Sequence, residues 1–157
     1  MMKYVTTAAF AAAAVMTVAA FTAPAQAADK KLVIAVVPKN LNNPFFDQAK
    51  IGCEKAVAEI GADKVECYFT GPGEHGGGDE QAQIVADLIA KGVDGIAVAA
   101  SNAAALASVL PQAKEKGIPV LTWDSDLLPA NKDLRVAYIG TYNYDIGTNL
   151  AKLAMEI

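Results

Sequence analysis

Residues 32–46 read LVIAVVPKNLNNPFF, and this stretch decides the fold. The apolar, largely β-branched run Leu32–Val37 predicts a strand. A helix should follow almost at once, because Asn43 is a good N-cap and Pro44 then occupies the first helical position. Ligands of parallel α/β sheets bind beyond the carboxyl ends of the strands, so this junction is also a candidate binding site.

The same alternation of apolar runs and helical spacing continues along the chain. Strands are predicted at residues 32–37, 64–69, 95–99, 120–123 and 136–139. Apolar residues recur at helical spacing between them, and Gly61, Gly92 and Gly117 stand where helices should end. Such a βαβ series predicts an α/β fold with a parallel sheet.

Both ends of the chain carry information of a different kind. Residues 1–27 are predicted to be a signal peptide, with Lys3 at the start, an alanine-rich apolar run and the cleavage motif Ala25-Gln26-Ala27. A membrane anchor is the weaker alternative, because the cleavage motif follows the run directly. We expect cleavage near Ala27/Ala28 and export to the periplasm. A helix from about Tyr144 meets no stop signal, so we expect the sequence to be a fragment.

The mature chain is acidic and large enough for one domain. Removing the signal peptide takes away Lys3 and no acidic residue, which leaves 12 basic against 17 acidic residues and a net charge of −5. An acidic surface repels phosphate backbones, so nucleic acid is not an expected partner. The roughly 130 remaining residues can form one hydrophobic core.

The chain has two cysteines, Cys53 and Cys67, and an exported protein resides where disulfides persist. A bridge between them would close a loop of about 15 residues and stabilise the fold by roughly 3 kcal/mol. Two separate buried thiols, one on a helix and one on a strand, are an equally good reading of the sequence.

The residue types needed for catalysis are scarce. There is one histidine, His75, and no serine in a nucleophile-elbow context or cysteine–histidine–aspartate cluster with metal spacing. We therefore expect no enzyme, no metal and no cofactor. Residues 71–76 match the dinucleotide pattern G-x-G-x-x-G, but they follow the second strand and carry Glu74, which repels anions. A loop at the rim of the site is the better reading of Gly71–Gly78.

Two aromatic residues, Phe45 and Phe46, begin the first helix beside Asn43. Both cannot face the sheet, so one of them should face the candidate site. A sugar ring packs its apolar face on an aromatic ring and needs amide or carboxylate partners for its hydroxyls. The alternative is that both phenylalanines belong to the core and Asn43 is only a cap.

Polar residues also follow the later strands. Asp124 follows the apolar run of the fourth strand, where a carboxylate is costly unless it accepts hydrogen bonds from ligand hydroxyls. Asp126 is predicted to cap a helix or turn. Ser101 after the third strand and Thr141 after the fifth add hydrogen-bonding groups to the same edge. Together these residues predict a binding site that carries out no reaction.

Five segments occur in a specific order: residues 41–46 (LNNPFF), 92–96 (GVDGI), 117–120 (GIPV), 122–126 (TWDSD) and 139–141 (IGT). Together they resemble the periplasmic sugar-binding proteins of ABC transporters, most of all the ribose-binding type. The resemblance implies a doubly wound parallel sheet in the order 2-1-3-4-5. Residues 28–157 would form an incomplete N-terminal lobe of a two-lobe protein, without the second lobe.

The resemblance also implies roles for single residues. Asn43 would bond a sugar hydroxyl, Phe45 and Phe46 would stack on the ring, Asp124 would hold two hydroxyls, and Thr141 would lie near the hinge. Ser125 adjoins Asp124 at the ligand site, where ribose binders commonly carry arginine. This departure argues against ribose itself as the ligand.

The function implied is that of a monomeric solute-binding component of an ABC importer. It would capture a monosaccharide or related polyol by closure of its lobes and deliver it to a membrane permease. A receptor that hands its ligand to a sensor domain would use the same fold. A less favoured alternative is an exported enzyme that uses the glycine-rich loop on a phosphorylated substrate.

Overall fold

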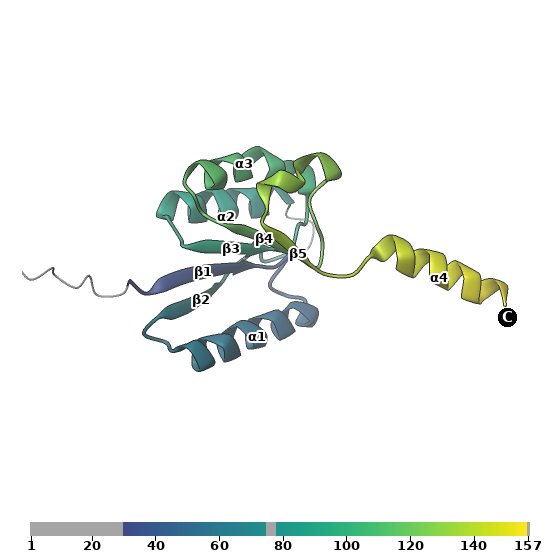
Figure 1. The fold of residues 1–157 in the computed structure, drawn as a ribbon, viewed down its shortest axis with the longest axis horizontal. Coiled ribbons are helices and arrows are strands. Elements are labelled where there is room, and N and C mark those ends of the chain that lie inside the picture. Colours follow the sequence, from purple (N-terminus) through teal and green to yellow (C-terminus); the bar gives the residue numbers. More distant parts are fainter. Residues whose placement is uncertain (1–29, 75–77, 157) are drawn as a thin grey trace, which may run out of the picture.

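The computed structural model describes residues 30–74 and 78–156. The predicted signal peptide and His75 lie outside these ranges. Within them, the chain alternates strands with helices (Figure 1).

The strands are β1 (Leu32–Val37), β2 (Val65–Phe69), β3 (Gly95–Val98), β4 (Val120–Trp123) and β5 (Ala137–Ile139). The helices are α1 (Pro44–Ile60), α2 (Gly78–Lys91), α3 (Ala103–Glu115) and α4 (Asn143–Met155), with the 3-10 helix η1 (Pro129–Leu134) before β5. The predicted bounds of β1 and β4 are confirmed, and those of the other strands differ by one residue at one end.

The strands form one parallel sheet in the order β2-β1-β3-β4-β5, which confirms the predicted order and fold class. The chain leaves β1 toward β2 on one side and then crosses back through α2 to β3 on the other. The order therefore reverses between β1 and β3. In open α/β sheets ligands bind at this switch point, beyond the carboxyl ends of the strands.

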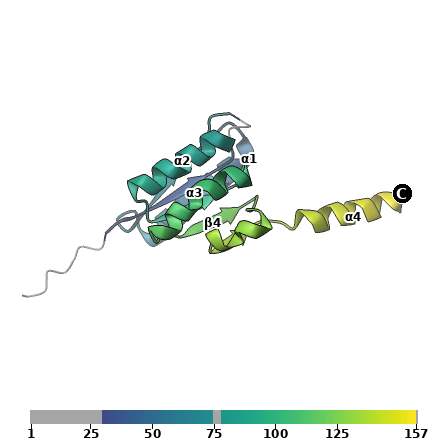
Figure 2. The ribbon, with the colours of Figure 1, turned by 90° about the horizontal axis from the view of Figure 1, so that it is seen from above.

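Helices cover the two faces of the sheet unequally. In Figures 1 and 2, α2, α3 and η1 lie over one face and α1 lies under the other, beneath β1 and β2. The core lies between the sheet and the helices α2, α3 and η1. Its fully buried residues include Val37, Val85, Leu88, Ile89, Val98, Leu106 and Leu110. Burying these aliphatic side chains stabilises the fold by roughly 1.5–3 kcal/mol each.

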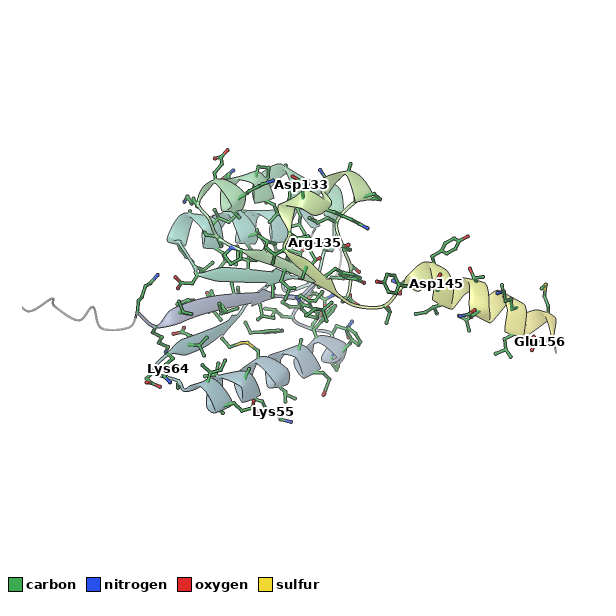
Figure 3. All side chains as sticks on the ribbon, viewed as in Figure 1. Lys55, Lys64, Asp133, Arg135, Asp145 and Glu156 are labelled. Carbon is green, nitrogen blue, oxygen red and sulfur yellow. A yellow bond between two sulfur atoms is a disulfide. The ribbon has the colours of Figure 1, made fainter. Side chains whose placement is uncertain are left out.

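The face under α1 is less densely covered. A disulfide joins Cys53 of α1 to Cys67 of β2, with an S–S distance of 2.08 Å, and it is the yellow bond in Figure 3. Beyond α1 the same face carries an apolar groove of about 160 Å³, lined in part by Ile34, Ala97 and Leu121. The disulfide thus compensates for the limited burial along α1, whose one buried residue is Phe46.

Local sequence signals account for the ends of the helices. Asn43 and Asn102 cap α1 and α3 by accepting hydrogen bonds from backbone N–H groups of the first turn. Gly92 and Gly117 have φ values of 72° and 69°, so they stop α2 and α3 in the left-handed region that glycine tolerates.

Helix α4 projects away from the rest of the chain (Figures 1 and 2). None of its residues is buried, and Ile146, Leu150 and Leu153 lie exposed along one side at helical spacing. In the described part of the chain, no helix is long and apolar enough to cross a membrane.

Candidate functional site

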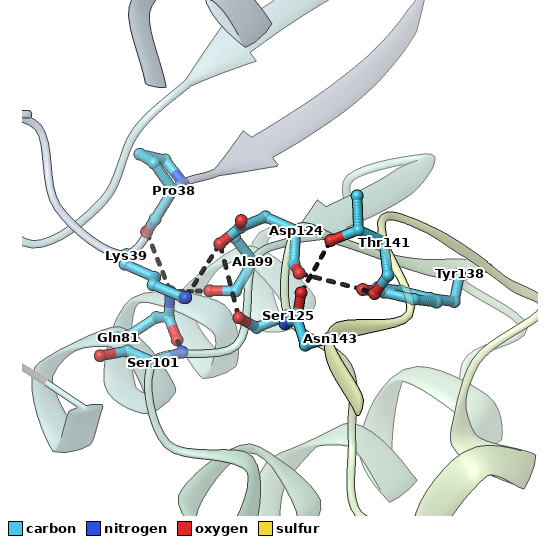
Figure 4. Close-up of polar contacts among 10 residues, drawn as sticks. All are labelled: Pro38, Lys39, Gln81, Ala99, Ser101, Asp124, Ser125, Tyr138, Thr141 and Asn143. Atoms are coloured by element: carbon cyan, nitrogen blue, oxygen red, sulfur yellow. Dashed lines mark hydrogen bonds and ion pairs between the residues drawn. The ribbon is translucent and has the colours of Figure 1, made fainter. Parts of the chain in front are cut away.

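The carboxyl ends of β1 and β3 are tied together by Gln81 of α2, which is fully buried. Its Nε2 donates to the carbonyl oxygens of Pro38 and Ala99, each at 2.9 Å, and its Oε1 accepts from the Ser101 N–H at 2.9 Å (Figure 4). One side chain therefore satisfies three backbone groups at the switch point. This fixes the chain on both sides of the place where a ligand would enter.

Lys39 and Asp124 form an ion pair over this edge. Lys39 Nζ lies 2.9 Å from Asp124 Oδ2, and the two side chains are 24% and 27% exposed. The residues follow β1 and β4, which are separated in the sheet by β3. The pair therefore crosses the end of β3, and Figure 4 shows it beside Ala99, the residue that follows this strand.

The backbone at Asp124 is in the left-handed region, with a φ of 58°. Among non-glycine residues, aspartate and asparagine accept this conformation most readily, and such strain gathers at functional sites. The Asp124 N–H donates to the carbonyl of Ile139 at 3.0 Å, and the Ser125 N–H donates to that of Trp123 at 2.6 Å. These bonds hold the turn that directs Asp124 toward Lys39.

Thr141 is linked to the same turn through Tyr138. The Tyr138 hydroxyl lies 3.0 Å from the Asp124 carbonyl oxygen and 3.2 Å from that of Thr141. The Thr141 hydroxyl donates to Asn143 Oδ1 at 2.8 Å. A Cβ at Gly140 would collide with the Tyr138 side chain, so a larger residue there would force Tyr138 to move.

Phe45 and Phe46 occupy different environments. Phe46 is 4% exposed and packs edge-to-face on Trp123, with ring centroids 5.6 Å apart. Phe45 is 61% exposed and packs edge-to-face on Phe46 at 5.2 Å. The reading in which both phenylalanines are core residues is therefore wrong. The exposed Phe45 ring thus packs on the buried Phe46 ring. Stacking of these rings on a ligand stays a prediction.

Asn43 acts as the cap of α1. Its Oδ1 accepts a hydrogen bond from the Phe45 N–H at 3.0 Å. Because the cap uses the oxygen, a ligand hydroxyl would meet the Nδ2 donor of this amide. The capping role is thus established in the structure, and the ligand role stays a prediction.

Asp126 does not cap a helix as its main role, which corrects the sequence prediction. Its carboxylate accepts from Arg135 Nε at 2.6 Å and Nη2 at 2.7 Å, and from the Thr122 hydroxyl at 2.7 Å. The Leu127 N–H adds a fourth bond at 2.8 Å. The Arg135 guanidinium, and then the smaller contributions of Thr122 and Leu127, lower the pKa of Asp126 to about 2. The pair ties β4 to the segment before β5.

The glycine-rich loop is attached to the β1–α1 connection. The Leu41 N–H donates to the carbonyl of Pro72 at 2.8 Å, and Asn42 Nδ2 donates to Glu74 Oε2 at 2.7 Å. This places residues 71–74 beside the candidate site, whereas 75–77 lie outside the described residues. Over the ranges that the structure describes, no group of three or more acidic, cysteine or histidine residues could hold a metal ion.

The sequence profile of the periplasmic binding protein domain matches residues 34–157, which is most of the chain. The chain belongs to the periplasmic binding protein domain family. A D-ribose/D-allose-binding protein from Pseudomonas aeruginosa is 32% identical over 127 residues, which cover 76% of this chain and 39% of that protein.

Solved structures of sugar- and solute-binding proteins match the fold as well. A solute-binding protein from Burkholderia graminis in complex with D-arabinose is 35% identical, with a TM-score of 0.70 over 82% of this chain and 42% of that one. GanP, a glucose-galactose binding protein from Geobacillus stearothermophilus, is 31% identical, with a TM-score of 0.71 over 81% and 43%. The chain therefore spans about two fifths of the length of these relatives.

In this periplasmic binding protein domain, the structure brings most of the predicted site residues to one edge. Asp124 and Ser125 adjoin each other, with the Ser125 hydroxyl 3.4 Å from Asp124 Oδ2. Tyr138 joins the Asp124 backbone to Thr141, and Gln81 holds Ser101 at the end of β3. Figure 4 shows this group. The predicted site residues near the start of α1, which are Asn43, Phe45 and Phe46, lie on the other side of this group, where Phe46 contacts Trp123.

Sequence reasoning missed three residues that shape this edge: Lys39, Gln81 and Tyr138. Lys39 had a usable signal, because it is the second residue after β1 and any charged group there lies beyond a strand end. Gln81 and Tyr138 had none. A glutamine in the first turn of a helix and a tyrosine in an edge strand are ordinary surface residues until the topology is known.

Proposed function

We propose that the protein is the solute-binding component of an importer for a monosaccharide or a related polyol. The observation that carries this proposal is the group at the switch point. The exposed Phe45 ring lies there at the start of α1, and a carboxylate paired with an ammonium group lies just beyond the ends of β4 and β1. The relatives that share this fold are named for the ribose, allose, glucose or galactose that they bind, or were solved with D-arabinose.

The chemistry of the edge fits an uncharged polyhydroxylated ring. Asp124 would accept a hydrogen bond from a sugar hydroxyl, and such charge-assisted bonds contribute roughly 1.5–3 kcal/mol each. The exposed Phe45 ring would pack against the apolar face of the sugar. Asn43, Ser101, Ser125 and Thr141 would serve the remaining hydroxyls around the same edge.

Binding would be completed by closure over the ligand. Residues 28–157 would act as one lobe, and a second lobe of the full-length protein would cover the opposite side of the sugar. The closed form would then be recognised by a membrane permease. This mode of action places the protein in the periplasm, after removal of residues 1–27, and it requires no covalent chemistry.

A thermal-shift screen of the full-length protein against a monosaccharide panel tests the proposal. A sugar at 100 times its dissociation constant should raise the stability by about 2.7 kcal/mol. Asp124→Ala should abolish that shift, whereas Asp133→Ala, which removes an exposed carboxylate away from the site, should keep it. The proposal would be contradicted if no sugar of the panel raised the thermal stability of the wild type, or if a sugar raised the stability of Asp124→Ala by as much as that of the wild type.

The 157-residue chain provides a second test. It would present only one side of the binding site, so we expect it to bind no sugar more tightly than millimolar. Isothermal titration calorimetry measures this directly. Micromolar binding by this chain alone would show that a second lobe is not needed.

A further inference from the structure

We propose that Trp123 of β4 is a positioning residue for ligand binding, because through Phe46 it fixes the orientation of the exposed Phe45 ring. The inference rests on the proposed function and extends it to a residue outside the predicted site. Trp123 makes no ligand contact of its own in this proposal. Its effect on affinity therefore passes through the Phe45 ring.

Trp123 lies on the face of the sheet opposite the main core. Side chains alternate along a strand, and Val120 and Thr122 of β4 are both buried, with Val120 in the core under α2 and α3. The Trp123 ring lies on the other face, where it meets Phe46 with ring centroids 5.6 Å apart and planes at 88°. Within the described residues, the main core contains neither ring. The contact therefore forms a separate aromatic cluster beside the site.

This contact holds the start of α1 to the sheet. Phe46 is the one buried residue of the helix. The disulfide between Cys53 and Cys67 lies seven residues further along, at about 10 Å, so it tethers the middle of α1 and not its first turn. The Asn43 cap bonds the Phe45 N–H and thus fixes only the backbone. The orientation of the Phe45 ring therefore depends on the ring on which it packs.

Three rings form a continuous series from the sheet to the solvent. Trp123 packs edge-to-face on Phe46, and Phe46 packs edge-to-face on Phe45 with centroids 5.2 Å apart and planes at 78°. Aromatic pairs prefer this geometry. Without such support, the 61% exposed Phe45 ring would sample several rotamers, and a ligand would have to order it on binding. The series therefore preorganises the surface on which a sugar would pack.

The backbone of Trp123 belongs to the turn at the end of β4. Its carbonyl oxygen accepts from the Ser125 N–H at 2.6 Å, and in the sheet the residue pairs with Ile139 of β5. One residue thus joins the aromatic start of α1 to the polar groups that follow β4 and β5. A sugar needs its apolar face and its hydroxyls met at the same time, so the distance between these two sets of groups matters for affinity.

Loss of the Trp123 ring should weaken sugar binding. For Trp123→Leu, which stays apolar, we expect an about 3- to 10-fold higher Kd. This change corresponds to roughly 0.7–1.4 kcal/mol and matches the cost of immobilising one side chain. Trp123→Phe keeps a ring and should stay within about twofold of the wild type. The matched control is Tyr68→Leu, which removes a ring that lies beside Leu88 of α2, away from Phe46, and it should also leave the Kd within about twofold.

A double-mutant cycle separates positioning from a general loss of stability. Calorimetry measures the Kd of wild type, Phe45→Ala, Trp123→Leu and the double variant in the full-length protein, with D-ribose, D-allose, D-arabinose, D-glucose and D-galactose as probes. Once residue 45 is alanine, Trp123→Leu should raise the Kd by less than about twofold, because the ring that it positions is gone. Trp123→Met also removes the ring, adapts to irregular space and should give the same non-additivity.

A purely structural role of Trp123 predicts that the two single losses multiply in the double variant. That result would overturn this inference and leave the proposed function standing. An unchanged Kd in Trp123→Leu or in Phe45→Ala would do the same, and so would failure of both the leucine and the methionine variant to fold. If the wild type binds none of the sugars, the proposed function fails and the inference with it.

Discussion

Acid should destabilise the protein through Asp126, because the folded structure favours the ionised form of this carboxyl group. The bonds from Arg135, followed in importance by those from Thr122 and Leu127, hold the pKa of Asp126 at about 2, below its usual 3.8. The two side chains of the ion pair are only 16% and 17% exposed. Solvent therefore screens this pair less than the ion pairs on the outer surface.

The sign and size of the effect follow from the depressed pKa. An acidic group with a lowered pKa in the folded state stabilises the protein fully above its unfolded pKa of 3.8. The stabilisation is lost as the pH falls through the folded pKa of about 2. At roughly 1.4 kcal/mol per pKa unit, the contribution is about 2 kcal/mol at neutral pH and a few tenths of a kcal/mol at pH 2.

Urea unfolding of wild type and Asp126→Asn at pH 6 and pH 2 measures this contribution. The neutral amide of the variant cannot compensate the charge of Arg135, so the variant should be less stable by about 2 kcal/mol at pH 6, and the difference should nearly vanish at pH 2. The pKa values of Asp94 and Asp133 are also lowered, by Lys30 and Lys114, but these groups titrate in both proteins and cancel. A difference of equal size at both pH values would refute the reasoning.

Two further predictions concern the framework of the site. Replacing both Cys53 and Cys67 by serine should lower the free energy of unfolding by roughly 3 kcal/mol, and reductant should have the same effect on the wild type only, as measured by urea unfolding. Gln81→Leu should cost about 3 kcal/mol, because three backbone groups lose their partner, whereas Gln83→Leu, on the exposed side of α2, should change stability little. Equal stability of the two glutamine variants would contradict the role of Gln81.

The fold could be predicted almost completely from the sequence, and the small errors have one physical cause. Lys64, Ala99 and Val136 were expected in strands and lie just outside them. Each still makes a ladder hydrogen bond to the neighbouring strand: Lys64 accepts from the Leu32 N–H, Ala99 donates to Val37, and Val136 donates to Val120. The three residues therefore lie at the ends of the ladders, where local composition does not determine at which residue a strand begins or ends.

The site could be predicted only in part. Asp124 was expected at the edge of the sheet, and one of Phe45 and Phe46 was expected to be exposed without an indication of which. The binding roles of these residues stay predictions. Gln81 is ordinary in sequence, and its role arises from topology. Lys39 could be noticed as a charged residue just beyond β1, but its ion-pair partner could not be predicted. The crossing from β2 through α2 to β3 brings Gln81 to the ends of two strands, and the order of the sheet brings Lys39 within reach of Asp124.

Asp124 and Asp126 show how one short motif can divide its acidic residues between stability and binding. The Arg135 guanidinium and two further donors saturate the carboxylate of Asp126, so little capacity remains for a ligand. The left-handed turn at Asp124 directs its carboxylate to the open edge, where one oxygen meets Lys39 and the other lacks a protein donor among the described residues. The two substitutions should therefore have opposite signatures. Asp126→Asn should cost stability and spare sugar affinity, whereas Asp124→Asn should cost affinity and spare stability.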